Sequence, residues 1–270
     1  FKQKTAYEIG VRLVGSEMCI RDRNILVCIS NVPDTTSKIN FVENDTKFDT
    51  NGIQFVINPN DEFGLTRAIW LKEKESCEVH VICVGGIDTD PILRKALAIG
   101  ADQAFRVDTN PMDANQVARE ISDFVKDKEY NLIIAGRESI DYNGGMVPGM
   151  IATLINANYV SNCVSLEVSQ PNFKATRETD GGKEEISGSI PLVIGSQKGL
   201  VEEKDLIIPN MRGIMMSRKK PLTIIEAKYQ TFQTDTVKYE KLPPKGAVKL
   251  VNPEKINDLI DLLHNEAKVI

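Results

Sequence analysis

The sequence is poor in the residues that build metal centres, disulfide frameworks and membrane spans. Its 270 residues include only two histidines, His80 and His264, which are too few for a histidine-based metal site. The five cysteines form an odd number and contain no C-x-x-C pair, which favours free thiols in a reducing, cytoplasmic-type compartment. No run of about 18 apolar residues occurs, so we expect no segment that crosses a membrane.

Charge and composition exclude further classes of protein. The formal net charge of −5 gives no electrostatic reason to bind nucleic acid. With 41% hydrophobic and 26% charged residues, the chain has an ordinary globular composition and is long enough to bury a full core. We therefore expect one large domain, alone or with appendages.

Residues 1–23 differ from the rest of the chain. They mix charges with short apolar pieces and lack the unbroken apolar core of a signal peptide. Their second half, from Val14 to Arg23, resembles translated adapter sequence. We predict that residues 1–23 are a non-native segment and that the native chain begins near Asn24.

From Asn24 onwards, short apolar runs alternate with helix signals. Strands are expected at residues 24–29, 79–84, 104–107 and 132–135. Helices are expected to begin near Asn58-Pro59, Asp90-Pro91 and Asp113, where proline or a capping side chain occupies the first positions. Continuous apolar strands are typical of sheets that are covered on both faces. The sequence therefore predicts an α/β fold, a Rossmann-like parallel sheet in three layers with helices on both sides.

The stretch from Gly136 to Ile151 has the order strand, polar turn, helix. Gly144, Gly145 and Gly149 would let the backbone turn sharply and approach a ligand closely. A helix that starts there directs unpaired N–H groups and the positive end of its dipole at an anion, most naturally a nucleotide phosphate. The spacing matches neither G-x-G-x-x-G nor the Walker P-loop, and glycines that serve only a strand–helix turn explain the same pattern.

Ligands of open α/β sheets sit beyond the carboxyl ends of the strands, where the strand order switches. Four segments that follow or end strands would meet there and line one site. Three of them have a plain structural reading as well, since Asn58-Pro59 serves as a helix cap, Val84 ends a strand and Asp141 forms turns. The candidate cofactor-binding residues are Cys28, Asn58, Pro59, Asn60, Asp61, Val84, Gly136, Arg137, Glu138, Ser139, Ile140, Asp141, Tyr142, Asn143, Gly144, Gly145, Met146 and Val147.

After residue 157 the pattern changes. Extended segments are expected at residues 164–168, 173–178 and 190–194, and the turn Asp180-Gly181-Gly182 indicates antiparallel pairing. Residues 206–216 are apolar and rich in methionine, and they precede the basic run 218–220. Methionine at a surface suits adaptable partner contacts, whereas a buried helix with a solvated basic end explains the same residues and is favoured by the pattern alone.

The last part of the chain is expected to need another surface. Residues 227–252 have little apolar periodicity and several prolines, which indicates an extended arm. Asn252-Pro253 then begins a helix with Ile256, Leu259, Ile260 and Leu263 on one face. Neither piece can bury much apolar surface by itself, so we expect both to dock on a companion chain.

Taken together, several motifs in this order resemble the β subunit of the electron transfer flavoprotein. The resemblance runs from about residue 24 to the end, and its most specific piece is Arg177-Glu-Thr-Asp-Gly-Gly182. The other motifs are Asn58-Pro59, Arg94-x-Ala-Leu-x-x-Gly-Ala-Asp102, Gly136-Arg-x-x-Ile-Asp141, Pro191 and Arg218-Lys-Lys-Pro221.

The resemblance implies an electron carrier and no catalytic residues of its own. It implies an adenine-nucleotide α-hydrolase-like sheet at residues 24–226 and a C-terminal arm and helix at 227–270 that dock on the α subunit. The α subunit would carry most of an FAD, and a structural AMP would bind at the candidate site. Electrons would come from acyl-CoA-type dehydrogenases of fatty acid oxidation and pass to a quinone-linked oxidoreductase, in a bacterial cytoplasm. The partner-docking residues would be Leu206, Ile207, Ile208, Pro209, Asn210 and Met211, with Met211 in place of an anchoring leucine.

Alternatives stay open at this point. The site loop lacks the glutamine and threonine side chains common in the family, so backbone N–H groups would have to supply more phosphate contacts. Val32-Pro33-Asp34-Thr35 resembles bifurcating relatives, in which a second FAD replaces AMP, whereas Arg177 to Gly182 favours AMP. A stand-alone stress-protein-like nucleotide module would end before residue 160, and an adenine-nucleotide hydrolase would carry a Ser-Gly-Gly-x-Asp loop that this sequence lacks.

Overall fold

The computed structural model describes residues 24–75, 77–243 and 246–270, and it divides the chain into two compact units. Among the described residues, the first unit contains residues 24–40 together with Asp49–Thr236, and the second contains Phe41–Phe48 together with Val237–Ile270. The prediction that residues 1–23 are non-native lies outside the described residues. No described helix is long and apolar enough to cross a bilayer.

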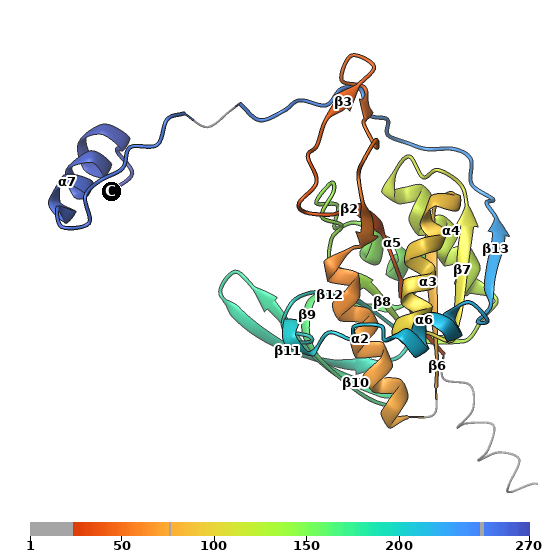
Figure 1. The fold of residues 1–270 in the computed structure, drawn as a ribbon. Helices are drawn as coiled ribbons and strands as arrows, with labels where there is room; N and C mark the ends of the chain where they lie inside the picture. The colour runs from red at the N-terminus through yellow and green to blue at the C-terminus, as the bar shows by residue number, and fades with distance from the viewer. Residues whose placement is uncertain (1–23, 76, 244–245) are drawn as a thin grey trace, which may run out of the picture. The chain divides into compact units, whose positions relative to one another are not determined.

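The first unit is built on a nine-stranded sheet with the order β11-β10-β9-β12-β8-β1-β6-β7-β13 (Figure 1). All neighbours from β9 to β13 in this order pair in parallel, while β10 pairs antiparallel with both β9 and β11. The strands are β1 (Asn24–Cys28), β6 (Glu78–Val84), β7 (Gln103–Asp108), β8 (Tyr130–Gly136), β9 (Asn158–Ser169), β10 (Asn172–Thr179), β11 (Gly182–Ser189), β12 (Leu192–Ser196) and β13 (Leu222–Glu226).

Helices cover both faces of this sheet, which confirms the three-layer prediction (Figure 1). Side chains of a strand alternate between faces, so Ile25 and Val27 of β1 pack in the core with α2 and α3, whereas Leu26 and Cys28 pack in the core with α4 and α5. The helices are α2 (Pro59–Lys74), α3 (Asp90–Ile99), α4 (Ala114–Lys126) and α5 (Val147–Leu154), with a short 3-10 turn, η1 (Ile87–Thr89), before α3.

The helix boundaries follow the local signals in the sequence. Pro59 occupies the first turn of α2, and α3 ends before Gly100, whose φ of 153° disfavours other residues. Asp113 caps α4 by accepting the N–H of Gln116 at 2.7 Å, as its position three residues earlier predicts.

Two smaller features were not expected from the sequence. Residues 31–57 contain two short antiparallel pairs, β2 (Asn31–Pro33) with β5 (Phe55–Ile57) in the first unit, and β3 (Phe41–Val42) with β4 (Lys47–Phe48) in the second. The predicted turn at Asp180 is confirmed, because β10 and β11 form a hairpin across Thr179 and Gly182.

The methionine-rich stretch is exposed, so the buried-helix interpretation of residues 206–216 is wrong. After the 3-10 turn η2 (Glu203–Asp205), only a short helix, α6 (Met211–Ser217), forms there. It packs on α3 so closely that a Cβ at Gly213 would lie 2.6 Å from the Ala98 carbonyl oxygen. Met211 is 75% exposed and Ile208 is 85% exposed.

The arm divides between the two units. Residues 227–236 belong to the first unit and lie along α4, where the Tyr229 N–H donates to Glu120 and the Gln233 N–H donates to Asp113. In the second unit, Tyr239 stacks on Phe41 with ring centroids 4.7 Å apart, and its N–H donates to the Asp45 carbonyl at 2.7 Å. The predicted last helix is present as α7 (Ile256–Asp261), continued by the π-helical turn η3 (Leu262–Ala267).

Candidate functional site

The strand order places the predicted site at a switch point of the sheet. β1 lies between β6 on one side and β8 on the other, so the chain leaves β1 in one direction and later returns to its opposite edge. The residues at the carboxyl ends of these three strands, Cys28, Val84 and Gly136, therefore lie at one edge. This is the arrangement on which the candidate site depends.

Asp61 joins the ends of β1 and β8. One carboxylate oxygen accepts the Ser30 N–H at 2.7 Å, and the other accepts the Gly136 N–H at 2.7 Å. The side chain is 2% exposed, and this burial raises the pKa of Asp61 to about 7, although the N–H groups of Ser30 and Gly136 act in the opposite direction. Both oxygens thus hold the protein's own backbone, and Asp61 acts as a positioning residue for the two strand ends.

Gly136 is needed because the first turn of α2 approaches β8 closely. A Cβ built at Gly136 would lie 2.3 Å from the Asp61 carboxylate and 2.8 Å from the Asn58 amide nitrogen. By contrast, a Cβ at Gly144, near the loop tip, would meet no atom within 4 Å. The glycine at the strand end is therefore explained by packing, whereas the space beside Gly144 is open for a ligand.

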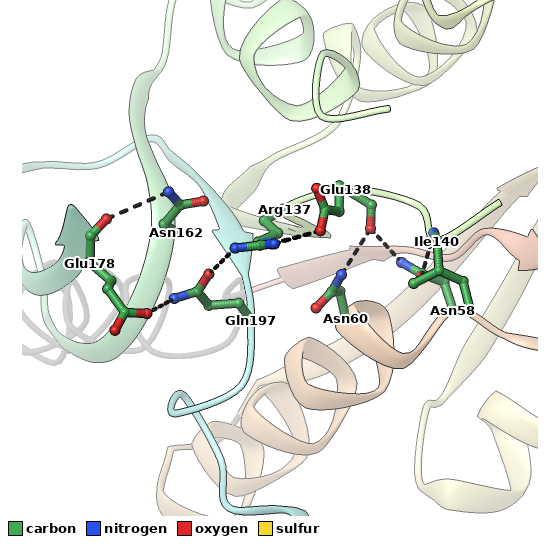
Figure 2. A network of polar contacts seen from close by, with 8 residues as sticks. All are labelled: Asn58, Asn60, Arg137, Glu138, Ile140, Asn162, Glu178 and Gln197. Carbon is green, nitrogen blue, oxygen red and sulfur yellow. Dashed lines mark hydrogen bonds and ion pairs between the residues drawn. The ribbon is translucent and has the colours of Figure 1, made fainter. Parts of the chain in front are cut away.

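Two asparagines at the start of α2, the N-cap residue Asn58 and Asn60 in the first turn, hold the loop that follows β8 (Figure 2). The side-chain amides of Asn58 and Asn60 both donate to the Glu138 carbonyl, at 2.9 and 3.1 Å, and the Asn58 side-chain oxygen accepts the Ile140 N–H at 3.3 Å. Asn58 occupies the predicted N-cap position, but its side chain makes no capping bond to the helix. It is used instead to fix the loop 80 residues further along the chain.

The loop tip is a turn organised by its own polar side chains. Asp141 accepts the Ser139 hydroxyl at 2.5 Å and the Tyr142 N–H at 2.9 Å, which supports its reading as a turn former. The left-handed conformation falls on Asn143, with φ of 51°, and asparagine tolerates this conformation better than most residues. A Cβ at Gly145 would lie 3.1 Å from the Arg137 carbonyl oxygen, and one at Gly149 would lie 3.4 Å from the Tyr159 ring. That the glycines let the backbone approach a ligand closely stays a prediction.

The helix that follows has the properties of an anion site. α5 begins at Val147 with no side-chain cap from Met146 and no acidic residue in its first turn. The first N–H groups of a helix have no partner within the helix, and Pro148 removes one of them. The positive end of the helix dipole is thus not neutralised by the helix's own residues, and Met146 directly before the helix is exposed.

A second polar network leads from the loop to β10 (Figure 2). The Arg137 guanidinium contacts the Glu138 carboxylate at 2.6 Å and donates to the Gln197 side-chain oxygen at 3.0 Å. The Gln197 amide donates to the Glu178 carboxylate at 2.7 Å, and the amide of Asn162 on β9 donates to the Glu178 carbonyl at 3.5 Å. The most specific motif of the resemblance is thereby connected to the candidate site.

Sequence reasoning missed two residues at the end of β12, Ser196 and Gln197. The Ser196 hydroxyl donates to the carbonyls of Asn60 and Ala135, at 2.7 and 3.1 Å, and its side chain is fully buried. Ser196 ends an apolar strand and Gln197 follows it, so the same carboxyl-end rule that selected Gly136 would have selected both.

Cys28 and Val84 place apolar side chains at the ends of β1 and β6. Cys28 is 7% exposed, and burial, with a smaller contribution from Asp61, raises the pKa of its thiol far above the ordinary range. A thiol in this state is not a nucleophile. Val84 is partly buried against the core beneath α4 and α5.

Comparison with known proteins gives a consistent result. The family described as "Electron transfer flavoprotein domain" matches residues 45–229. The chain is 32% identical to the electron transfer flavoprotein subunit beta of Bacillus subtilis, covering 92% of this chain and 100% of that one. It is 30% identical to the protein of that name from Syntrophomonas wolfei, over 91% and 97% of the two chains, and 28% identical to that from Dictyostelium discoideum, over 91% and 98%.

Proposed function

The chain belongs to the electron transfer flavoprotein family as a β subunit, and from this premise we propose that it pairs with an α subunit, shares an FAD with it and binds AMP at the carboxyl end of its own sheet. The bound FAD would supply the redox chemistry by accepting electrons and passing them on. This chain would bind, orient and shield, and we assign no catalytic residue to it.

The observation that carries the AMP proposal is the cradle formed by the loop of residues 137–146 and the start of α5. A phosphate fits there, because the α5 N-terminus carries no acidic residue and a Cβ at Gly144 would meet nothing within 4 Å. The two carboxylates of the loop are engaged elsewhere, Glu138 with Arg137 and Asp141 with Ser139. The remaining candidate residues would act through their backbone or, like Cys28 and Val84, as apolar walls.

Residues 206–211 would dock the electron donor, which we propose to be an acyl-CoA-type dehydrogenase of fatty acid oxidation. Ile208 and Met211 are exposed, and the short helix α6 that begins at Met211 is held in place by hydrogen bonds. The Asn210 side chain caps α6 by accepting the Gly213 N–H at 2.8 Å, and Arg94 donates to the carbonyls of Ser217 and Lys220, both at 2.8 Å. Flexible apolar side chains on a rigid support suit contacts with more than one partner.

The second unit would hold the α subunit. In α7, Ile256, Leu259 and Ile260 expose between 44% and 64% of their surface, although the helix is amphipathic. A helix of six residues with an uncovered apolar face gains its stability from the surface that it contacts. We propose that the α subunit provides this surface, that electrons leave to a quinone-linked oxidoreductase, and that the complex works in a bacterial cytoplasm.

Co-expression with the neighbouring reading frame tests the central proposal. We expect a 1:1 heterodimer with a flavin absorbance spectrum and one AMP per heterodimer after acid extraction. Two flavins and no AMP would identify the bifurcating type, which the segment from Val32 to Thr35 resembles. A monomer that binds a nucleotide without the partner would support the stress-protein-like module and would reject the proposed pairing with an α subunit.

Met211→Glu tests the docking assignment. A charge at an exposed apolar anchor should slow reduction of the flavin by the dehydrogenase by roughly tenfold or more, because an unpaired carboxylate that is buried against an apolar partner surface loses its hydration. The flavin content should stay unchanged. Met112→Glu, which changes an exposed methionine that precedes α4, is the matched control. Equal reduction rates for Met211→Glu and wild type would reject docking at this loop.

A further inference from the structure

A hollow of about 510 Å³ lies at the opposite end of the sheet from the AMP cradle. It is bounded by the second half of α4, by Tyr130 at the start of β8, by the end of α5 and by Pro191, which precedes β12. Tyr229 of the arm closes one side. A volume of this size is typical of sites for small organic ligands.

The walls of this hollow carry positive charge, although the chain as a whole has a net charge of −5. Arg119, Lys126 and Lys128 line it, and the one carboxylate among the lining residues, Asp123, forms an ion pair with Lys228 at 2.5 Å. An anion that enters would therefore meet three cationic groups and a carboxylate that is already neutralised. Electrostatic attraction of this kind selects negatively charged ligands.

Two of these cations are held by aromatic rings. The Arg119 guanidinium lies 5.7 Å from the centroid of the Tyr229 ring, and the Lys128 ammonium lies 3.1 Å from that of Phe124. Burial also lowers the pKa of Lys128, as is usual for an ammonium that has lost part of its hydration. An oxyanion would replace the lost hydration of this group, and the rings already restrict the positions of both side chains.

Ser122 supplies an unused hydrogen-bonding group. Its side chain is 7% exposed, lines the hollow, and has no hydrogen-bond partner for its hydroxyl among the described residues. A buried hydroxyl without a hydrogen-bond partner lowers the stability of the folded protein. A ligand bound in the hollow would supply the missing partner. An oxygen of an anion held by the neighbouring cations would accept its proton.

The remaining walls are apolar or aromatic. Val125, Leu154, Ile155 and Pro191 line the hollow, and Tyr130 is fixed there by a 2.8 Å hydrogen bond between its hydroxyl and His80 Nδ1. An inorganic ion would leave most of this surface and volume unfilled. We propose that the hollow binds a small organic phosphate monoester, with the phosphate between Arg119, Lys126, Lys128 and Ser122 and a flat apolar body against the tyrosines and aliphatic side chains.

Occupancy would also fasten the arm to α4. Tyr229 is already held there, since its N–H donates to Glu120 at 2.6 Å and its carbonyl accepts from the Gln116 side chain at 2.8 Å. A ligand that contacts Arg119 and the Tyr229 ring adds a bridge between these elements. Amide hydrogen exchange in residues 228–234 should therefore slow when the ligand binds.

The test is calorimetric titration of the full chain, together with any chain that co-purifies, with phenyl phosphate after one equivalent of AMP has bound and the free AMP has been removed. We expect saturable binding with a dissociation constant of about 1 mM or lower, and weaker binding of inorganic phosphate and of benzyl alcohol. Failure of phenyl phosphate to bind, or equal affinity for inorganic phosphate, overturns the proposal. Binding that is lost once that one equivalent of AMP is bound, and that the Arg119 and Lys126 variant described below retains in AMP-free protein, would place the phosphate in the cradle and overturn the proposal as well.

Two variants locate the site. Arg119→Gln combined with Lys126→Gln should weaken phenyl phosphate at least about tenfold, because charge-assisted contacts are the strongest of those proposed. Ser122→Ala removes a hydroxyl that has no partner among the residues that the structure describes, so it should weaken binding by a few fold without lowering the thermal midpoint. Lys174→Gln, which changes an exposed cation on β10, is the control. Unchanged affinity in the double variant overturns the assignment.

Discussion

Replacing Asp61 by asparagine should change how the stability of the protein depends on pH. Asp61 is buried, and its two carboxylate oxygens accept the N–H groups of Ser30 and Gly136, each at 2.7 Å. Asparagine has nearly the same shape, but one of its two terminal atoms is an NH₂ donor. In either orientation, this donor faces a backbone N–H, so one of the two hydrogen bonds is lost.

The sign of the pH effect follows from the pKa of Asp61, which burial raises from 3.8 to about 7 in the folded protein. Between these values the folded protein holds a proton that the unfolded chain releases. The stabilisation from this proton is present below pH 3.8 and is lost as the pH rises through about 7. Between about pH 5 and about pH 8, Asp61 alone should lower the free energy of unfolding by about 2–3 kcal/mol.

The assay is urea unfolding of wild type and Asp61→Asn at both pH values. Near pH 5 the variant should be less stable by about 1–3 kcal/mol, because a buried N–H loses its acceptor. Near pH 8 the difference between the free energies of unfolding of wild type and variant should be smaller by about 2–3 kcal/mol. The reason is that only the wild type then buries a charge. All other titrating groups cancel in the comparison. Asp180→Asn, in the exposed turn between β10 and β11, should shift stability by no more than about 0.5 kcal/mol at either pH. A gap that stays constant or widens towards pH 8 would refute the reasoning.

Two further substitutions test the packing around the candidate sites. Gly136→Ala places a methyl group 2.3 Å from the Asp61 carboxylate and should lower the free energy of unfolding by about 1–3 kcal/mol. Gly144→Ala, whose methyl group meets nothing within 4 Å, should leave the free energy of unfolding nearly unchanged. Equal thermal midpoints for the two variants would contradict this prediction. Arg94→Met removes the two hydrogen bonds at the end of α6 and should speed amide hydrogen exchange in residues 214–220. Arg212→Met, in the same helix, should not change the exchange rates of these residues. Equal exchange rates in the two variants would show that Arg94 does not anchor the helix.

The fold could be predicted because its signals are local. Apolar runs of strand length, Pro59 at a helix start and Asp113 as a cap each act within a few residues of the chain. The switch point followed from the alternation of strands and helices together with a general rule for parallel sheets. The short pairs within residues 31–57 were missed because strands of two or three residues give no periodic pattern.

The hydrogen bonds within the candidate site could not be predicted, because the residues that they join lie far apart in the sequence. The bond between Asp61 and Gly136 spans 75 residues, and that between Arg137 and Gln197 spans 60. Asn58 is an example. The sequence predicted that it occupies a helix-cap position, but it did not predict that its side chain binds the loop after β8. Composition could not predict whether residues 206–216 are buried or exposed, because methionine suits a core as well as a surface. The packing of α6 on α3 decides that Met211 faces outwards.

The use of polar side chains differs between the two ends of the sheet, and this difference bears on what each end recognises. At the carboxyl end, Asn58, Asn60 and Asp61 bind the protein's own backbone, so the ligand that we propose there would be left with main-chain N–H groups and the end of α5. Main-chain recognition would depend on the loop keeping its shape, and these three side chains, at the cap and in the first turn of α2, hold the loop in place. At the amino end, Arg119, Lys126 and Ser122 belong to α4, and the proposed ligand would meet the side chains themselves. Substitutions in α2 should therefore weaken the cradle through the position of the loop, whereas substitutions in α4 should weaken the hollow directly and leave the fold intact.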